Sequence, residues 1–91
     1  MESKMFSQRF QKNVQLTHHV KARMEKRDIS LELLLDLIET GGIRNKSEVE
    51  MWIYKSYAEH SEGLVCTAVV VGQAVIVKTV MVDWILEEAQ P

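Results

Sequence analysis

The sequence predicts an α+β fold with two N-terminal helices packed on one face of a three- to four-stranded antiparallel sheet. Two patterns lead to this prediction. Between residues 16 and 40 apolar side chains recur every three or four positions, which is the period of an amphipathic helix. From residue 49 onward they alternate with polar residues or run continuously, which is typical of strands. Short connections between these segments favour an antiparallel order.

The two helices are predicted over residues 17–27 and 30–40. Thr17 is the expected N-cap of the first helix, because a threonine hydroxyl can accept a bond from a free backbone N–H in the first turn. Ser30 is the expected N-cap of the second helix, which presents a leucine-rich core face. Gly41 and the glycine after it are expected to stop that helix.

Three strands are predicted over residues 48–58, 64–71 and 74–82. The first alternates apolar and polar side chains, so one of its faces should be buried. The second is apolar along almost its whole length and should be covered on both faces. Gly72 suits the first position of a two-residue type II′ turn between the last two strands.

A sheet that is apolar on both faces needs a second cover besides the helices. The termini or another copy of the protein would supply it, and we expect a homodimer. Trp52 and Tyr54 point away from the predicted helical face and fit such a contact. Ordinary pairing between neighbouring strands is the other interpretation of these two aromatic residues.

The 91 residues suit a single domain, with residues 1–15 as an N-terminal arm, 16–82 as the core and 83–91 as a C-terminal tail. No apolar run approaches the roughly 18 residues of a membrane span, and we expect a cytoplasmic protein without membrane contact. The single cysteine, Cys66, is expected in the core. No metal site or cofactor is expected.

The formal net charge of −2 conceals an asymmetry along the chain. Residues 1–27 carry seven basic and two acidic residues, whereas residues 28–91 carry four basic and eleven acidic ones. Proteins that bind nucleic acids gather positive charge on one surface, and the first helix is the candidate surface here. Internal pairing of the two halves is the competing interpretation. The nearby carboxylates for that pairing belong to Glu32, Asp36, Glu48 and Glu50.

His19, Arg23 and Arg27 follow one another at intervals of four residues, so on a helix they form one basic stripe. Arg27 is expected closest to the apolar face, with Arg23 and His19 nearer to solvent. Arginine beside apolar side chains requires an anionic or carbonyl partner. The stripe therefore predicts either an anion-binding cleft or a network of ion pairs.

Residues 16–30 resemble the opening motif of a bacterial domain-of-unknown-function family, His-(Ala/Val)-x-x-Arg-x-x-x-Arg-(Gly/Asp)-Ile-Ser. A leucine-rich helix, an aromatic strand and a hydrophobic strand follow in that family. Its last strand is similar to residues 76–80, so the resemblance extends over residues 16–82. The family is similar in plan to the RelE and BrnT ribonuclease toxins, a RelE- or barnase-like arrangement, and some members are thought to be toxin nucleases.

The resemblance implies a metal-independent ribonuclease of a toxin–antitoxin system, with RNA and an antitoxin protein as partners. His19 would act as general base or acid, Arg23 and Arg27 would hold the phosphate, and Thr79 would donate a hydrogen bond. The alternative is a non-catalytic homodimeric or partner-binding domain. In that domain the same stripe would be structural.

Overall fold

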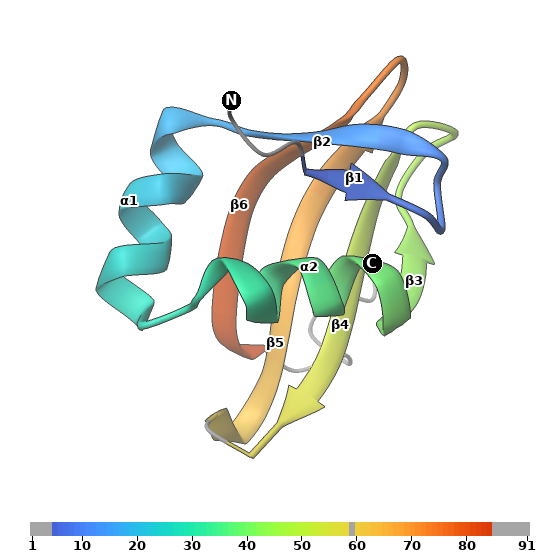
Figure 1. Cartoon of the computed structure of the whole chain (residues 1–91). Coiled ribbons are helices and arrows are strands. Elements are labelled where there is room, and N and C mark those ends of the chain that lie inside the picture. Colours follow the sequence, from blue (N-terminus) through green and yellow to red (C-terminus); the bar gives the residue numbers. More distant parts are fainter. Residues whose placement is uncertain (1–4, 59, 85–91) are drawn as a thin grey trace.

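The computed structural model describes residues 5–58 and 60–84 (Figure 1). Most of the predicted C-terminal tail, residues 85–91, therefore lies outside the described residues. The elements are β1 (Phe6–Ser7), β2 (Lys12–Leu16), α1 (His18–Arg27), α2 (Leu31–Thr40), β3 (Gly42–Asn45), β4 (Glu50–Tyr57), β5 (His60–Val71) and β6 (Val75–Trp84).

The predicted fold class, including the RelE- or barnase-like arrangement, was wrong. The six strands of the described chain form one mixed, curled sheet in the order β1-β2-β6-β5-β4-β3, which gives a half-barrel (Figure 1). The three predicted strands are present as β4, β5 and β6, and they pair antiparallel. Two further strands precede the helices and a third follows them, so the helices are not N-terminal.

The segment predicted as an N-terminal arm forms β1 and β2. Strand β2 runs parallel to β6, with Val14 opposite Val75 and Leu16 opposite Val77. Val14 is buried, whereas the residues on either side of it are exposed, so β2 has the alternation of a half-buried strand. Five residues are too few for that period to stand out in the sequence. Its pairing partner also lies 61 residues further along the chain.

Both helices contribute to a single core on the concave side of the sheet. Figure 1 shows α2 lying across β4 and β5, with α1 beside β6. Helix α2 buries Leu34, Leu37 and Ile38, and α1 buries Val20 and Met24. These side chains join the inward residues of the strands in one apolar cluster. The opposite face of α1 is therefore left on the surface of the protein.

Both predicted N-caps are confirmed. The Thr17 hydroxyl accepts a 3.2 Å bond from the Val20 N–H, and the Ser30 hydroxyl accepts a 3.0 Å bond from the Leu33 N–H. Helix α2 ends at Gly41, which has an extended backbone with a φ of −72°. Glycine is required there by close packing and not by a left-handed conformation.

The predicted type II′ turn at Gly72 was wrong. Val71 and Val75 are the closing pair of the β5–β6 hairpin, so three residues form the loop. The N–H of Gly72 donates a 3.0 Å bond to the carbonyl of Ala74. A type II′ turn needs a positive φ at its first central residue. None of the glycines in the described part of the chain has one.

A β-bulge interrupts the pairing of β5 with β6. Ala68 is opposite Thr79 and Val69 is opposite Val77, which leaves Lys78 as an extra residue in β6. Val77 and Val80 are fully buried on the helix side, whereas Lys78 is exposed and Thr79 is half-buried. The bulge therefore changes which face of the sheet the following side chains occupy.

Candidate functional site

The outer side of α1 carries a basic pocket of about 400 Å³. Helix α1 has four basic residues and one glutamate, and Val20 and Met24 hold its other side against the core. Side chains three and four positions apart lie on the same side of a helix, which brings the basic groups together. The pocket is lined by His19, Ala22, Arg23, Lys26 and Arg27.

The order of exposure along the stripe differs from the prediction. Arg23 is half-buried, whereas His19 and Arg27 are exposed, so the prediction that Arg27 lies closest to the apolar face was wrong. Arg27 is the last residue of α1, and the chain turns away at Asp28, which has a left-handed conformation (φ 58°, ψ 46°). Arg23, one turn earlier, is the arginine that packs on the body of the protein.

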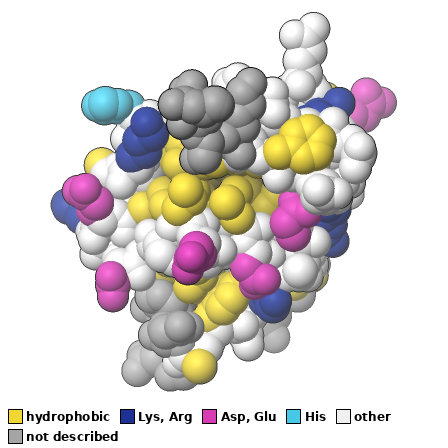
Figure 2. Space-filling model, in the orientation of Figure 1, with side chains coloured by type: hydrophobic (Ala, Val, Ile, Leu, Met, Phe, Trp, Pro, Cys, Tyr) yellow, Lys and Arg dark blue, Asp and Glu magenta, His cyan; other side chains and the backbone are white. Residues whose placement is uncertain are grey.

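Within residues 5–58 and 60–84, neither arginine of the stripe pairs with a carboxylate. Among the described residues the ion pair that forms is between Lys55 and Asp36, at 3.0 Å, and Arg23 and Arg27 make no ion pair or hydrogen bond. Figure 2 shows acidic and basic side chains interspersed over the face of the molecule seen there. For the part of the chain described, internal pairing does not account for the stripe.

Glu39, on α2, is engaged with the β1–β2 turn. Its carboxylate accepts bonds from the Ser7 hydroxyl at 2.5 Å and from the N–H groups of Gln8 and Arg9 at 3.0 and 3.1 Å. The guanidinium of Arg9 in turn donates to the carbonyl of Ile38 at 3.0 Å. These contacts join the N-terminal hairpin to the end of α2. The Glu39 carboxylate is therefore bound by the β1–β2 turn and not by the arginines of α1.

Asp36 is engaged with β4. It accepts a 2.5 Å bond from the Tyr57 hydroxyl and a 3.0 Å bond from the Lys55 ammonium. The hydrogen bond from Tyr57, followed by that from Lys55, lowers the pKa of Asp36 below its ordinary value. This carboxylate is therefore held in its charged form by strand residues, away from the arginines of α1.

Thr79 does not join the basic pocket. It lies in β6 opposite Ala68, and its carbonyl accepts a 2.8 Å bond from the Thr67 hydroxyl. Thr79 is not one of the residues that line the pocket on α1. The structure thus brings together His19, Arg23 and Arg27 from the predicted set and adds Lys26. Helical spacing of three from Arg23 was the signal that would have included Lys26.

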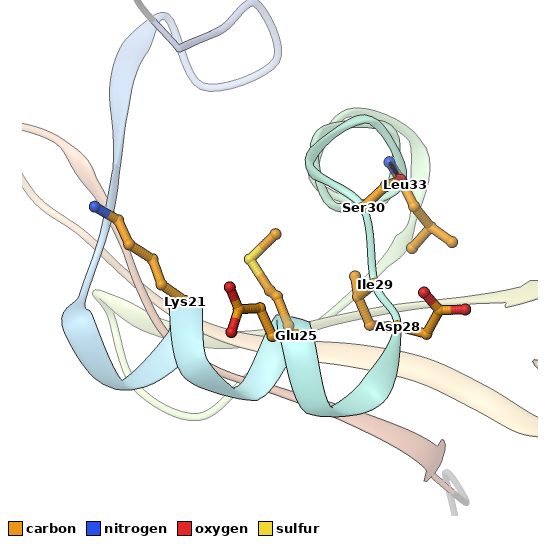
Figure 3. Close-up of a pocket in the computed structure, with 7 residues that line it drawn as sticks. Lys21, Glu25, Asp28, Ile29, Ser30 and Leu33 are labelled. Atoms are coloured by element: carbon orange, nitrogen blue, oxygen red, sulfur yellow. Dashed lines mark hydrogen bonds between the residues drawn. The ribbon is translucent and has the colours of Figure 1, made fainter.

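A larger cleft of about 610 Å³ lies between α1 and the start of α2 (Figure 3). Its floor includes the buried side chains of Met24 and Ile29. Lys21, Glu25 and Asp28 contribute one positive and two negative charges. Because the charges of this cleft nearly cancel, it offers less attraction for an anion than the basic pocket on the other side of the same helix.

Cys66 is fully buried, and burial raises the pKa of its thiol to about 12. A thiol in this environment stays protonated and packs as a small core side chain. Within residues 5–58 and 60–84, no three His, Cys, Asp or Glu side chains are grouped so that they could hold a metal ion. The helices of that region are too short to cross a membrane.

Comparisons with protein-family models, with curated proteins and with solved structures find no match to this chain. The resemblance of residues 16–82 to the domain-of-unknown-function family therefore stays a prediction. The fold and the site of the described residues define a small protein with two helices on a six-stranded, mixed half-barrel sheet and a basic helix face.

Proposed function

We propose that this protein binds RNA through the outer side of α1. The observation that carries the proposal is the basic pocket, in which Arg23, Lys26 and Arg27 converge without a carboxylate partner among the described residues. Guanidinium groups bind phosphate oxygens through paired, charge-assisted hydrogen bonds. Lysine adds a point charge that favours the phosphate backbone whatever the base sequence.

Metal-independent cleavage of RNA is a second candidate function. It is favoured by the position of His19 in the same pocket as Arg23, because an imidazole can serve as a general base or acid next to a bound phosphate. His19 would take the proton of a ribose 2′-hydroxyl while the arginines stabilise the charge that develops on the phosphate. Both functions are consistent with a protein of the cytoplasm, where RNA is available.

Matched lysine variants of α1 test the binding proposal. Lys26 lines the basic pocket and Lys21 lines the neighbouring cleft, and both are exposed on the same helix. We expect Lys26→Ala to weaken binding of a labelled single-stranded RNA several-fold more than Lys21→Ala in fluorescence anisotropy. Removing a phosphate contact should also lower the slope of log affinity against log salt by about 0.7. Equal losses for the two variants would contradict a localised site.

The cleavage candidate has its own assay. Labelled RNA is incubated with the protein in the presence of EDTA, and products are examined for 2′,3′-cyclic phosphate ends. We expect His19→Ala to abolish cleavage but to retain binding, because the His19 side chain is exposed and its removal should leave the core intact. Intact RNA after incubation with a wild-type protein that binds it would remove the nuclease candidate and leave the binding function. Overexpression that fails to slow growth would argue against a toxin.

The predicted protein partners, an antitoxin and a second copy, belong to the same proposal. An antitoxin that blocks RNA binding would present acidic side chains to the basic pocket on α1. The dimer prediction depended on the two-sided apolar strand β5. Val65, Cys66 and Thr67 are consecutive in that strand and all three are fully buried within a single chain. Burial of β5 therefore does not require a second copy, and sedimentation at micromolar concentration would decide the oligomeric state.

A further inference from the structure

A second group of basic side chains lies around Trp52 on the outer face of the sheet. Met51 and Ile53 of β4 are buried on the helix side. Because successive side chains of a strand point to opposite faces, Trp52 lies on the outer face. Its side chain is half-buried.

Strand pairing places basic residues on both sides of this ring. Arg44 of β3 is directly opposite Trp52, and Ala68 of β5 is opposite it on the other side. Residues that face each other across strands have their side chains on the same face of the sheet. Beyond Ala68, Lys78 of β6 lies on the outer face, because it follows the buried Val77, and it lines the same pocket as Trp52.

Trp52, Ala68 and Lys78 line a pocket of about 160 Å³ next to the ring, and Arg44 lies outside its lining. Because the side chain of Ala68 is small, a depression remains beside Trp52. The ammonium nitrogen of Lys46 lies 6.0 Å from the centre of a Trp52 ring, at the outer limit of a cation–π contact. The pocket is lined by Lys46, Glu50, Met51, Trp52, Ala68, Val69 and Lys78.

The gathering of positive charge here is unusual for this part of the chain. Residues 28–91 contain only four basic residues, namely Arg44, Lys46, Lys55 and Lys78. Lys55 is paired with Asp36 on the helix side of the sheet, and the other three lie around Trp52. The carboxylate in the pocket, Glu50, accepts a weak 3.4 Å bond from Ser47.

We infer that this pocket is a second RNA subsite, in which one unpaired base stacks on Trp52 while the adjoining phosphates contact Arg44, Lys46 and Lys78. The inference rests on the proposed function and narrows its ligand to single-stranded RNA, because a base inside a duplex has no free face for an aromatic side chain. Stacking on an aromatic ring beside positive charges is how proteins hold single strands without reading their sequence.

Intrinsic fluorescence tests this subsite directly. The chain has two tryptophans, so the Trp84→Phe variant has Trp52 as its only one. This full-length variant is titrated with an oligouridylate of about 12 nucleotides and with an abasic oligomer that has the same number of phosphates. Binding of both oligomers is followed independently by anisotropy of a terminal label. We expect the oligouridylate, but not the abasic oligomer, to quench Trp52 at saturation.

Substitution of the ring gives the corresponding change in affinity. Trp52→Leu should weaken binding of the oligouridylate about tenfold and that of the abasic oligomer less than twofold, and Trp52→Phe should restore part of the loss. If Trp52→Leu does not fold, substitution of the exposed Lys78 tests the subsite instead. Lys78→Ala should lower the salt slope by about 0.7, whereas Lys55→Ala, on the opposite face of the sheet, should leave it unchanged.

The contrary results separate this inference from the proposed function. Saturated RNA binding without a change in Trp52 fluorescence, or equal quenching by the abasic oligomer, overturns the subsite and leaves binding by α1 intact. Quenching by polyglutamate as strong as that by RNA assigns the pocket to an acidic protein segment instead. Failure of the wild-type protein to bind either oligomer at low salt overturns the proposed function, and the subsite with it.

Discussion

At the scale of single residues, the charged side chains fall into two groups, those that bind other parts of the fold and those that do not. Asp36 and Glu39 on α2 are held by strand and turn residues. Arg23 and Arg27 on α1 make no such contacts within the described residues. Basic side chains that lie together on one side of a helix and have no acidic partner contribute little to the stability of the fold, because like charges repel each other. An external anion would relieve that repulsion, which is why binding is expected at α1.

The Asp36 contacts predict a dependence of stability on pH. Because the folded-state pKa of Asp36 is lowered, its stabilising contribution is present above the unfolded pKa, about 3.9, and is lost as the pH falls through the folded value. Asp36→Asn should therefore reduce the free energy of unfolding at pH 7, by less than about 1 kcal/mol because the side chain is 46% exposed. Urea unfolding over a pH series should show this difference shrinking below about pH 4. A difference that stays constant down to the lowest pH would contradict the assignment.

At the scale of elements, the end of α2 is defined by close packing against β4. A Cβ atom at Gly41 would lie 2.7 Å from the carbonyl oxygen of Leu37 and 2.8 Å from that of Tyr54. Both neighbours are backbone atoms of regular elements and have little freedom to move. The glycine thus allows the chain to pass from α2 into β3 without separating the helix from the sheet.

Two glycine substitutions test this explanation. Gly41→Ala should lower the free energy of unfolding by about 1 to 3 kcal/mol, because the added methyl group overlaps backbone atoms. Gly72→Ala is the matched control, since nothing lies within 4 Å of its Cβ position and its φ is not positive. It should be neutral or stabilise by up to about 1 kcal/mol through the unfolded state. Thermal and denaturant unfolding measure the stability of both variants. Similar changes in the free energy of unfolding would show that close packing does not account for the glycine at position 41.

At the scale of the whole molecule, the half-barrel depends on the N-terminal strands. Strand β2 covers one side of β6 through its parallel pairing, and Val14 is 4% exposed within the common core. Without β2 the backbone of β6 would be an open sheet edge next to the apolar side chains of Val75 and Val77. Residues 5–15 are thus part of the fold and not a detachable arm.

A variant lacking residues 1–16 should consequently fail to unfold cooperatively, and it should aggregate or bind a hydrophobic dye. Val14→Ala is the milder change. It should cost about 1.6 kcal/mol for two buried carbon atoms, plus a term for the cavity. Asn13→Ala, at the exposed neighbouring position, should stay within about 0.5 kcal/mol. A truncated protein with an unchanged melting transition would disprove the structural role of β2.

Local sequence signals determined the parts of this protein that depend on neighbours along the chain. Helical periodicity and the hydroxyls of Thr17 and Ser30 predicted the bounds of both helices to within one residue. The interval of four residues placed His19, Arg23 and Arg27 on one side of α1, because that spacing is a property of any α-helix. Alternation of apolar and polar residues located β4, and the apolar residues around Gly72 located β5 and β6, because strand patterns are also local to the chain.

Tertiary structure decided what depends on contacts between distant segments. The parallel pairing of β2 with β6 made a half-barrel, and a five-residue strand carries too little periodicity to reveal a partner 61 residues away. The β-bulge at Lys78 put Thr79 opposite Ala68 on the outer face of the sheet, where unbroken alternation after the buried Val77 would have turned it toward the core. Both outcomes depend on register between strands, which single-residue preferences do not encode.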